Sequence, residues 1–304
     1  MRRREFIALI CGGAASWPFA ARAQQPDRQR RVGVLLPISY NDPEYQPWLT
    51  AFKQALQELG WVDGRNMRID IHWATANPAE IRRQAAELVA LAPDVILAPG
   101  TNTVGQLMQA TRTVPIVFPI IADPVAGGFV ESLARPGGNA TGFMLFEYSI
   151  SGKWLELLKQ IAPGVTRVAV LGDPDIPTGP AQFGVIQAVA PSLRVEASSF
   201  NKRDADEIER VITTFARSPN GGLIVTAGGP GFVNRELIIT LAARYKLAGM
   251  YFDRAFVANG GLLSYGPSAD PNARSKAIRE LLSITAFLLF KIRPGSGCSL
   301  LTHL

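Results

Sequence analysis

The feature that most constrains the fold of this chain is an alternation of apolar runs and amphipathic segments that occurs twice along its 304 residues. Val32 and Val168, in the first apolar run of each half, are 136 positions apart, and Val95 and Ile224 are 129 positions apart. Short continuous apolar runs are typical of parallel strands that helices cover on both faces. Although any α/β chain can repeat by chance, the pattern favours two similar α/β lobes, each a doubly wound parallel sheet.

The spacing of apolar residues predicts the same order of elements in both halves. In the first half the predicted strands are Val32–Pro37, Met67–Trp73, Asp94–Ala98 and Ile116–Ile121, and the predicted helices are Pro47–Leu59, Pro78–Leu91 and Val104–Ala110. In the second half the predicted strands are Arg167–Leu171, Arg194–Ser198, Leu223–Thr226 and Gly249–Asp253, and the predicted helices are Ala181–Ala190, Asp204–Ala216 and Val233–Tyr245.

The first 23 residues read as an export signal. They combine a basic start, an apolar stretch and the ending Ala21-Arg22-Ala23, which is typical of a cleaved signal peptide. We expect the cut between Ala23 and Gln24. The run Arg3-Arg4-Glu5-Phe6 fits the twin-arginine type of signal. The pattern therefore predicts a periplasmic protein that does not itself span the membrane.

The charge and the cysteine and histidine counts exclude several function classes. The net charge is +6, but four arginines and one glutamate of the signal account for half of it. We interpret the basic pairs Arg82–Arg83 and Lys202–Arg203 as solvated surface, so no nucleic-acid partner is expected. With two cysteines and two histidines in the chain, no Cys/His metal cluster is expected, and no cofactor.

The residues needed for common catalytic chemistry are missing. His72 falls inside an alternating strand, where we interpret it as an edge or surface residue rather than a catalytic base. The chain holds no G-x-S-x-G elbow, Walker A or G-x-G-x-x-G motif. The carboxylates at strand ends suit either acid–base work or the binding of a ligand ammonium group. We expect a binding protein and not an enzyme.

Polar and small residues follow the predicted strands at their carboxyl ends, where open parallel sheets bind ligands. With two lobes, both sets of strand ends can face one cleft. Each such residue taken alone is better explained as a turn former, but the six strand ends together favour a ligand cleft. The expected ligand-binding residues are Tyr40, Asn41, Thr101, Asn102, Asp123, Asp173, Thr178, Gly229, Tyr251 and Asp253.

Several stretches resemble ABC-transporter substrate-binding proteins related to the tryptophan/tyrosine uptake type. They read PIVFPIIADPVAGGFVESLARPGGNATGF, KWLELLKQIAPGVTRVAVLGDP and FVANGGLLSYGPS. The resemblance implies a type I periplasmic-binding-protein fold, with two lobes joined by a hinge. It also implies a small organic ligand, an amino acid or aromatic compound, that is delivered to an ABC permease in the inner membrane. A monomer or weak dimer is expected.

The resemblance also implies lobe boundaries. The first lobe would hold residues 31–163 plus 262–290, the second lobe 165–260, and an irregular tail 291–304. The crossings between lobes would fall near Pro163-Gly164 and Gly260-Gly261. The chain departs from the family pattern after about Ala277, which suggests a frameshift or truncation. Two alternatives stay open: a periplasmic ligand sensor that presents to a membrane receptor, and a non-functional truncated paralogue.

Overall fold

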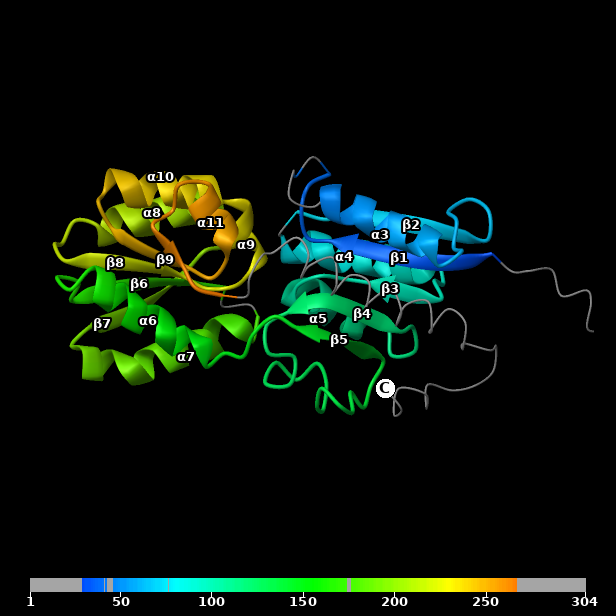
Figure 1. The fold of residues 1–304 in the computed structure, drawn as a ribbon, viewed down its shortest axis with the longest axis horizontal. Helices are drawn as coiled ribbons and strands as arrows, with labels where there is room; N and C mark the ends of the chain where they lie inside the picture. Colours follow the sequence, from blue (N-terminus) through cyan, green and yellow to red (C-terminus); the bar gives the residue numbers. More distant parts are fainter. Residues whose placement is uncertain (1–28, 41, 43–45, 76, 174–175, 267–304) are drawn as a thin grey trace, which may run out of the picture.

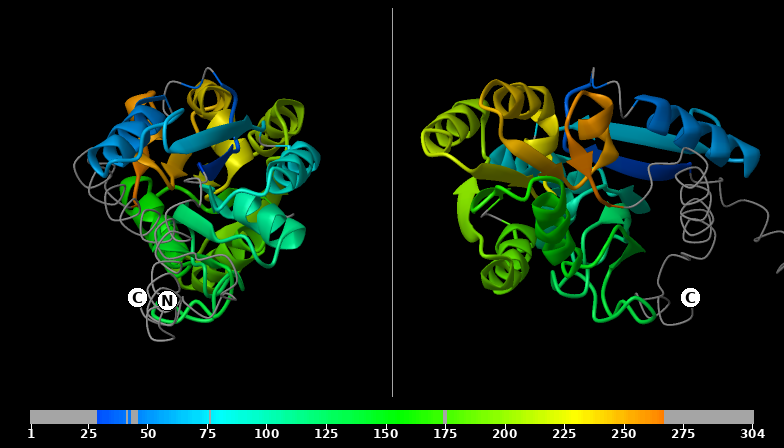
Figure 2. Two further views of the ribbon diagram at one scale, coloured as in Figure 1. Left: turned by 90° about the vertical axis from the view of Figure 1, so that its right-hand side faces the viewer. Right: turned by 60° about the vertical axis from the view of Figure 1, so that its left-hand side comes forward.

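The computed structural model describes residues 29–40, 42, 46–75, 77–173 and 176–266. These residues form two α/β lobes that lie side by side along the long axis of the molecule (Figure 1). In the right-hand view of Figure 2, the blue helix of the first lobe and the yellow-green elements of the second lobe lie toward opposite ends of the molecule. Each lobe contains one five-stranded parallel sheet, so the predicted fold class is confirmed.

The first lobe is built on a sheet of order β2-β1-β3-β4-β5. Its strands are β1 (Arg30–Leu36), β2 (Met67–Trp73), β3 (Val95–Leu97), β4 (Ile116–Ile121) and β5 (Ala140–Met144), and its helices are α3 (Gln46–Glu58), α4 (Pro78–Ala90) and α5 (Thr101–Ala110). The chain adds β2 on one side of β1 and β3 on the other, which is the reversal of a doubly wound sheet.

The second lobe repeats this topology. Its sheet has the order β10-β9-β8-β6-β7, so β6 matches β1, β7 matches β2 and the remaining strands follow in step. Its strands are β6 (Arg167–Gly172), β7 (Glu196–Asn201), β8 (Gly221–Val225), β9 (Ala248–Tyr251) and β10 (Leu263–Ser264). Its helices are α6 (Ile150–Ile161), α7 (Thr178–Val189), the 3₁₀ helix η1 (Ala190–Leu193), α8 (Ala205–Phe215), α9 (Gly229–Val233), α10 (Arg235–Arg244) and α11 (Arg254–Ala258).

Strand β1 shows why a continuously apolar strand lies in a sheet that helices cover on both faces. Val34 contributes to a core with Phe52 of α3, whereas its neighbour Leu35 contributes to a core with Leu88 of α4 on the opposite face. Successive side chains of a strand point to opposite faces, so a central strand must be apolar throughout. The outer strand β2 is only half-buried, which is why its sequence alternates, and His72 lies on it as predicted.

The lobe boundaries differ from those expected from the sequence. Helix α6, assigned above to the first lobe, packs Trp154 and Leu158 into the core of the second. Residues 262–290 were expected in the first lobe, but β10, at the start of this range, pairs with β9 of the second lobe, with Leu263 opposite Met250. The boundaries came from the resemblance, and the sequence could not correct them, because apolar periodicity marks which face of an element is buried but not which sheet buries it.

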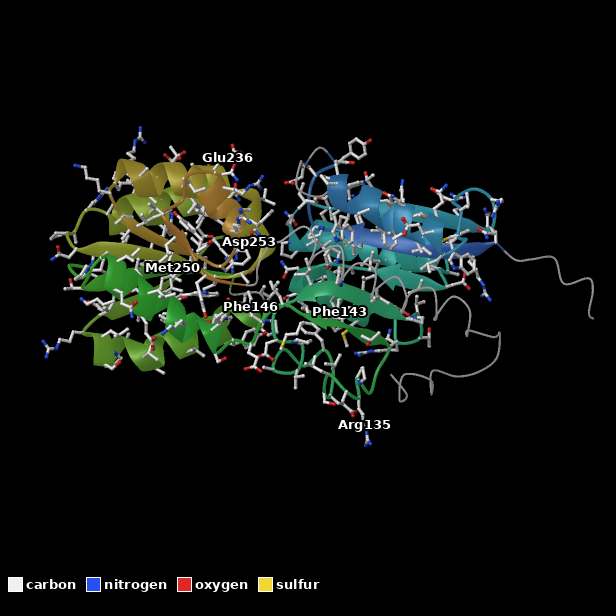
Figure 3. The ribbon with its side chains drawn as sticks, in the orientation of Figure 1. Arg135, Phe143, Phe146, Glu236, Met250 and Asp253 are labelled. Atoms are coloured by element: carbon white, nitrogen blue, oxygen red, sulfur yellow. The ribbon has the colours of Figure 1, made fainter. Side chains whose placement is uncertain are left out.

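The chain crosses between the lobes after β5, and Asp123 anchors the crossing. The backbone N–H of Asp123 donates to the carbonyl of Phe146 at 2.9 Å. Its carboxylate accepts from the backbone N–H of Tyr148 at 3.1 Å and from that of Ala126 at 3.0 Å. Figure 3 shows Phe146 between the two lobes. The crossing therefore lies near residues 145–149, ahead of the expected Pro163-Gly164.

Several predictions concern residues outside the described part of the chain. These are the signal peptide at 1–23, the end of the first lobe at 267–290, and the tail at 291–304. Within the described residues, no helix is long and apolar enough to cross a membrane.

Two glycines of α7 give a matched test of the packing between this helix and β6. A Cβ atom at Gly179 would lie 2.0 Å from the carbonyl oxygen of Asp173, whereas one at Gly184 would meet nothing within 4 Å. We expect Gly179→Ala to lower the free energy of unfolding by about 2 kcal/mol or more, because the backbone must shift. We expect Gly184→Ala to be neutral or to stabilise by up to about 1 kcal/mol. Urea unfolding of both variants measures the difference, and equal effects would contradict the packing.

Candidate functional site

The candidate site lies where the two lobes contact each other through polar side chains. Thr101 Oγ1 of the first lobe lies 3.3 Å from Thr178 Oγ1 of the second, and the hydroxyl of Tyr148 lies 3.4 Å from the same Thr178 atom. Asn102 Nδ2 donates to Asp173 Oδ2 at 3.4 Å. Side chains from both lobes and from the crossing segment therefore meet in one cluster.

The folding of each lobe places these residues at the carboxyl ends of its strands. Helix α5 begins at Thr101 shortly after β3, and Gly100 makes the turn with φ of 86°. Asp173 follows β6 directly, and Thr178 opens α7. Thr178 and Asp173 are 1% and 3% exposed. Parallel strands present their carboxyl ends at a shared edge, so both lobes bring this edge to the boundary between them.

Lys202 lies in the same cluster, although the sequence suggested a solvated basic pair. It follows β7 and is 0% exposed, so that interpretation was wrong for this residue. Its ammonium group donates to the backbone carbonyl of Thr226. Burial lowers the pKa of Lys202 to about 7, and the negative charge of Asp173 partly opposes the shift. A buried amine behaves this way because desolvation penalises its charged form.

Two buried amide atoms of the cluster have no hydrogen-bond partner among the described residues: Asn102 Oδ1 and Gln182 Nε2. The partners of the other amide atoms fix their identity. Asn102 must turn its N–H toward the carboxylate of Asp173, and the backbone N–H of Ala227 requires the oxygen of Gln182, which accepts at 3.2 Å. The cluster therefore presents one unused acceptor from the first lobe and one unused donor from the second.

A second contact joins the lobes on another side of the site. Arg235 Nη1 at the start of α10 lies 3.8 Å from Asp42 Oδ2, and both side chains are largely buried. The guanidinium also lies over the ring of Phe232, with Arg235 Cζ 5.0 Å from the ring centroid. Ion pairs that are shielded from water act more strongly than exposed ones, so this pair adds to the attraction between the lobes.

Four of the ten predicted residues meet directly in the cluster: Thr101, Asn102, Asp173 and Thr178. A fifth, Gly229, begins α9 beside Lys202, because the neighbouring Gly231 packs against the lysine side chain. Asn41 lies outside the described residues.

The other four predicted residues have different surroundings. Asp123 holds the crossing segment, as described above. Tyr251 is 1% exposed and stacks on Phe256 at 4.7 Å inside the second lobe, so its side chain belongs to the core. Asp253 caps α11 by accepting from the backbone N–H of Ala255, and Figure 3 shows it on the side of its lobe that faces the first. Tyr40 is 65% exposed and contacts Trp73 edge to face.

Sequence reasoning missed Lys202, Gln182, Tyr148 and Arg235. Only Lys202 carried a partial signal, because it comes shortly after the predicted strand Arg194–Ser198; the strand that forms, β7, ends directly before it. Gln182 and Arg235 lie on helices, and the sequence does not distinguish a buried polar residue of a helix from one on its solvated face.

The cluster combines hydrogen-bond acceptors with donors and charges of both signs, which suits recognition of a small polar molecule. Within the described residues, no group of three His, Cys, Asp or Glu side chains is placed to hold a metal ion.

Comparisons with known proteins give one family match and several more distant relatives. The family model described as ABC transporter substrate binding protein matches residues 31–271. A tyrosine-binding protein of Clostridioides difficile is 25% identical over 245 residues, which are 79% of this chain and 68% of that protein. The structure of an ABC domain from Streptococcus pneumonia in complex with L-Trp has a TM-score of 0.74 at 20% identity, and covers 88% of this chain and 86% of its own.

A more distant structure shares the fold. The solute binding protein of an ABC transporter from Rhodopseudomonas palustris, in complex with 3,4-dihydroxy benzoic acid, has a TM-score of 0.55 at 15% identity. It covers 86% of this chain and 79% of its own.

The lowered pKa of Lys202 makes stability depend on pH. Between about pH 7 and pH 10.5, the ordinary pKa of a lysine, Lys202 holds a proton in the unfolded chain but not in the folded chain. The free energy of unfolding therefore rises with pH in this window. The rise is at most about 1.4 kcal/mol per pH unit for one proton, and we expect Lys202→Met to remove it. Urea unfolding at several pH values above 7 measures the difference from wild type. The matched control is Lys53→Met, on an exposed position of α3, and a slope unchanged by Lys202→Met would contradict the burial of its charge.

Proposed function

The chain belongs to the family of ABC transporter substrate binding proteins, and we propose from this premise that it binds a small amino acid or aromatic solute between its two lobes. Binding would shift the protein toward the closed arrangement, because only there does a ligand contact both lobes. The site binds its ligand without transforming it, as the family implies.

The observation that carries this proposal is the pair of unused amide atoms in the interlobe cluster. Asn102 Oδ1 and Gln182 Nε2 are buried without partners among the described residues. A buried polar group without a partner costs free energy, and a ligand that supplies the partner recovers it. The L-Trp bound by one structural relative and the name of the tyrosine-binding protein point to the class of solute.

We further propose that the protein is exported to the periplasm and delivers its ligand to an ABC permease of the inner membrane, acting as a monomer or weak dimer. The family match favours delivery to a permease over presentation to a sensory receptor. The basic and apolar pattern of residues 1–23 supports export.

Binding is tested by calorimetry of the full chain with L-tryptophan and L-tyrosine. We expect Asn102→Ala to weaken binding of the preferred ligand by about tenfold, because an acceptor for the ligand and the contact with Asp173 are both lost. The matched control is Gln109→Ala, on the exposed face of the same helix, which should leave the affinity unchanged. Failure of the wild type to bind either amino acid would contradict an aromatic amino acid as the ligand, and equal effects of the two variants would contradict the interlobe site.

Export is tested by replacing Arg3 and Arg4 with lysine. A twin-arginine signal is recognised by a receptor, so the paired guanidinium groups are needed even though the charge is kept. We expect the double variant to accumulate in the cytoplasm, while the wild type reaches the periplasm with a new N-terminus at Gln24. Cell fractionation and N-terminal sequencing measure both. Normal export of the variant would contradict the twin-arginine assignment.

A further inference from the structure

One side chain of the first lobe holds the segment that crosses to the second, and we propose that Asp123 is a positioning residue that stabilises the closed arrangement without touching the ligand. Because its carboxylate acts on the crossing segment, it raises the affinity for every ligand by the same factor. This inference rests on the proposed function, since closure affects affinity only if a ligand binds between the lobes.

Asp123 binds the crossing segment at two points. Its backbone N–H donates to the carbonyl of Phe146, and its Oδ2 accepts from the backbone N–H of Tyr148. The other carboxylate oxygen, Oδ1, accepts from the backbone N–H of Ala126 in the following loop, which fixes the orientation of the carboxylate. A residue that only formed this local turn would need one oxygen. The second oxygen binds a residue 25 positions away, so Asp123 does more than shape its own loop.

The segment that Asp123 holds is attached to the second lobe. The carbonyl of Tyr148 accepts from the backbone N–H and from the hydroxyl of Ser151 in α6, at 3.1 and 2.6 Å. The ring of Phe146 packs edge to face against Trp154 of the same helix, with the ring centroids 5.7 Å apart, between the two lobes (Figure 3). Both aromatic side chains belong to the core of the second lobe. A rotation of that lobe therefore carries the segment away from Asp123, which follows β4 of the first lobe.

The backbone of Asp123 supports a use for its side chain. Its φ is 41°, in the left-handed region that glycine adopts freely and that most side chains avoid. Such strained residues concentrate at functional positions. A glycine would relieve the strain, but it would also remove the carboxylate that holds Tyr148. The bond to the crossing segment is thus a physical reason for a strained residue at this position.

The bond from Tyr148 to Asp123 is linked to the contact between the lobes. The hydroxyl of Tyr148 lies 3.4 Å from Thr178 Oγ1, which lies 3.3 Å from Thr101 Oγ1 of the first lobe. Separation of the lobes breaks the contact between the two threonines, and the bond to Asp123 breaks with it. Without this bond the closed arrangement is less populated, and the apparent affinity of any ligand falls with the fraction of protein that is competent to bind.

The experiment compares Asp123→Asn and Asp123→Gly with the wild type in the full chain, by calorimetry with L-tryptophan and L-tyrosine. Asparagine tolerates a positive φ but has only one acceptor oxygen, and glycine relieves the strain but has none. We expect Asp123→Asn to weaken binding of both amino acids about threefold to tenfold, as the loss of one hydrogen bond does, and Asp123→Gly at least as much. The ratio of the two dissociation constants should stay that of the wild type. The matched control is Asp206→Asn, at an exposed position of α8, which should change neither affinity.

Small-angle X-ray scattering of the same proteins measures closure itself. Without ligand, we expect a larger radius of gyration for both Asp123 variants than for the wild type and Asp206→Asn, because the open arrangement is more extended. With saturating ligand the radii should be equal. If Asp123 served only its own loop, its variants would lower the melting temperature but leave the radius unchanged.

The outcomes separate this inference from the proposed function. Unchanged radii overturn the role of Asp123 and leave the proposed function standing. An affinity loss that differs between the two amino acids also overturns it, because Asp123 would then contact the ligand. If the wild type binds neither amino acid, the proposed ligand class fails, and the radii of the unliganded proteins alone decide whether Asp123 holds the lobes together. If Asp123→Asn does not fold, Asp123→Gly decides the question, since its backbone is unstrained.

Discussion

The carboxylate of Asp173 is one of the polar groups through which the two lobes contact each other. It belongs to the second lobe and accepts a hydrogen bond from Asn102 of the first lobe. It also interacts electrostatically with the buried ammonium group of Lys202. A buried carboxylate is tolerated only when such partners compensate its lost hydration. In the proposed function, the need to satisfy this group would link the approach of the two lobes to the chemistry of the ligand between them.

Much of the fold could be predicted from the sequence because parallel strands covered on both faces must be apolar throughout. Met67–Trp73 and Ile116–Ile121 form strands with the predicted ends, and the two lobes share one topology. The positions of α6 and β10 could not be predicted, because either sheet offers an apolar face of the same kind. Only the contact of Trp154 with the second core, and the pairing of Leu263 with Met250, decide between the lobes.

The site was predictable to the extent that strand ends define it. The rule placed Asp173 and Thr178 at the carboxyl edge of the sheet, and both lie in the polar cluster between the lobes. Tyr251 follows the same rule but turns into the core, because successive strand residues point to opposite faces and the rule does not say which face meets the ligand. Lys202 was misjudged because the sequence of a Lys-Arg pair shows charge but not burial.

The most direct test of the account is a crystal structure of the full chain grown with L-tyrosine or L-tryptophan. The account predicts the amino acid between the lobes, with its ammonium group within hydrogen-bond distance of the Asp173 carboxylate and side chains of both lobes in contact with it. A ligand bound instead at the far end of the second lobe, in the pocket bordered by Gly164, Asn220 and Leu247, would contradict the interlobe site. So would a ligand between the lobes that leaves Asp173 without contact.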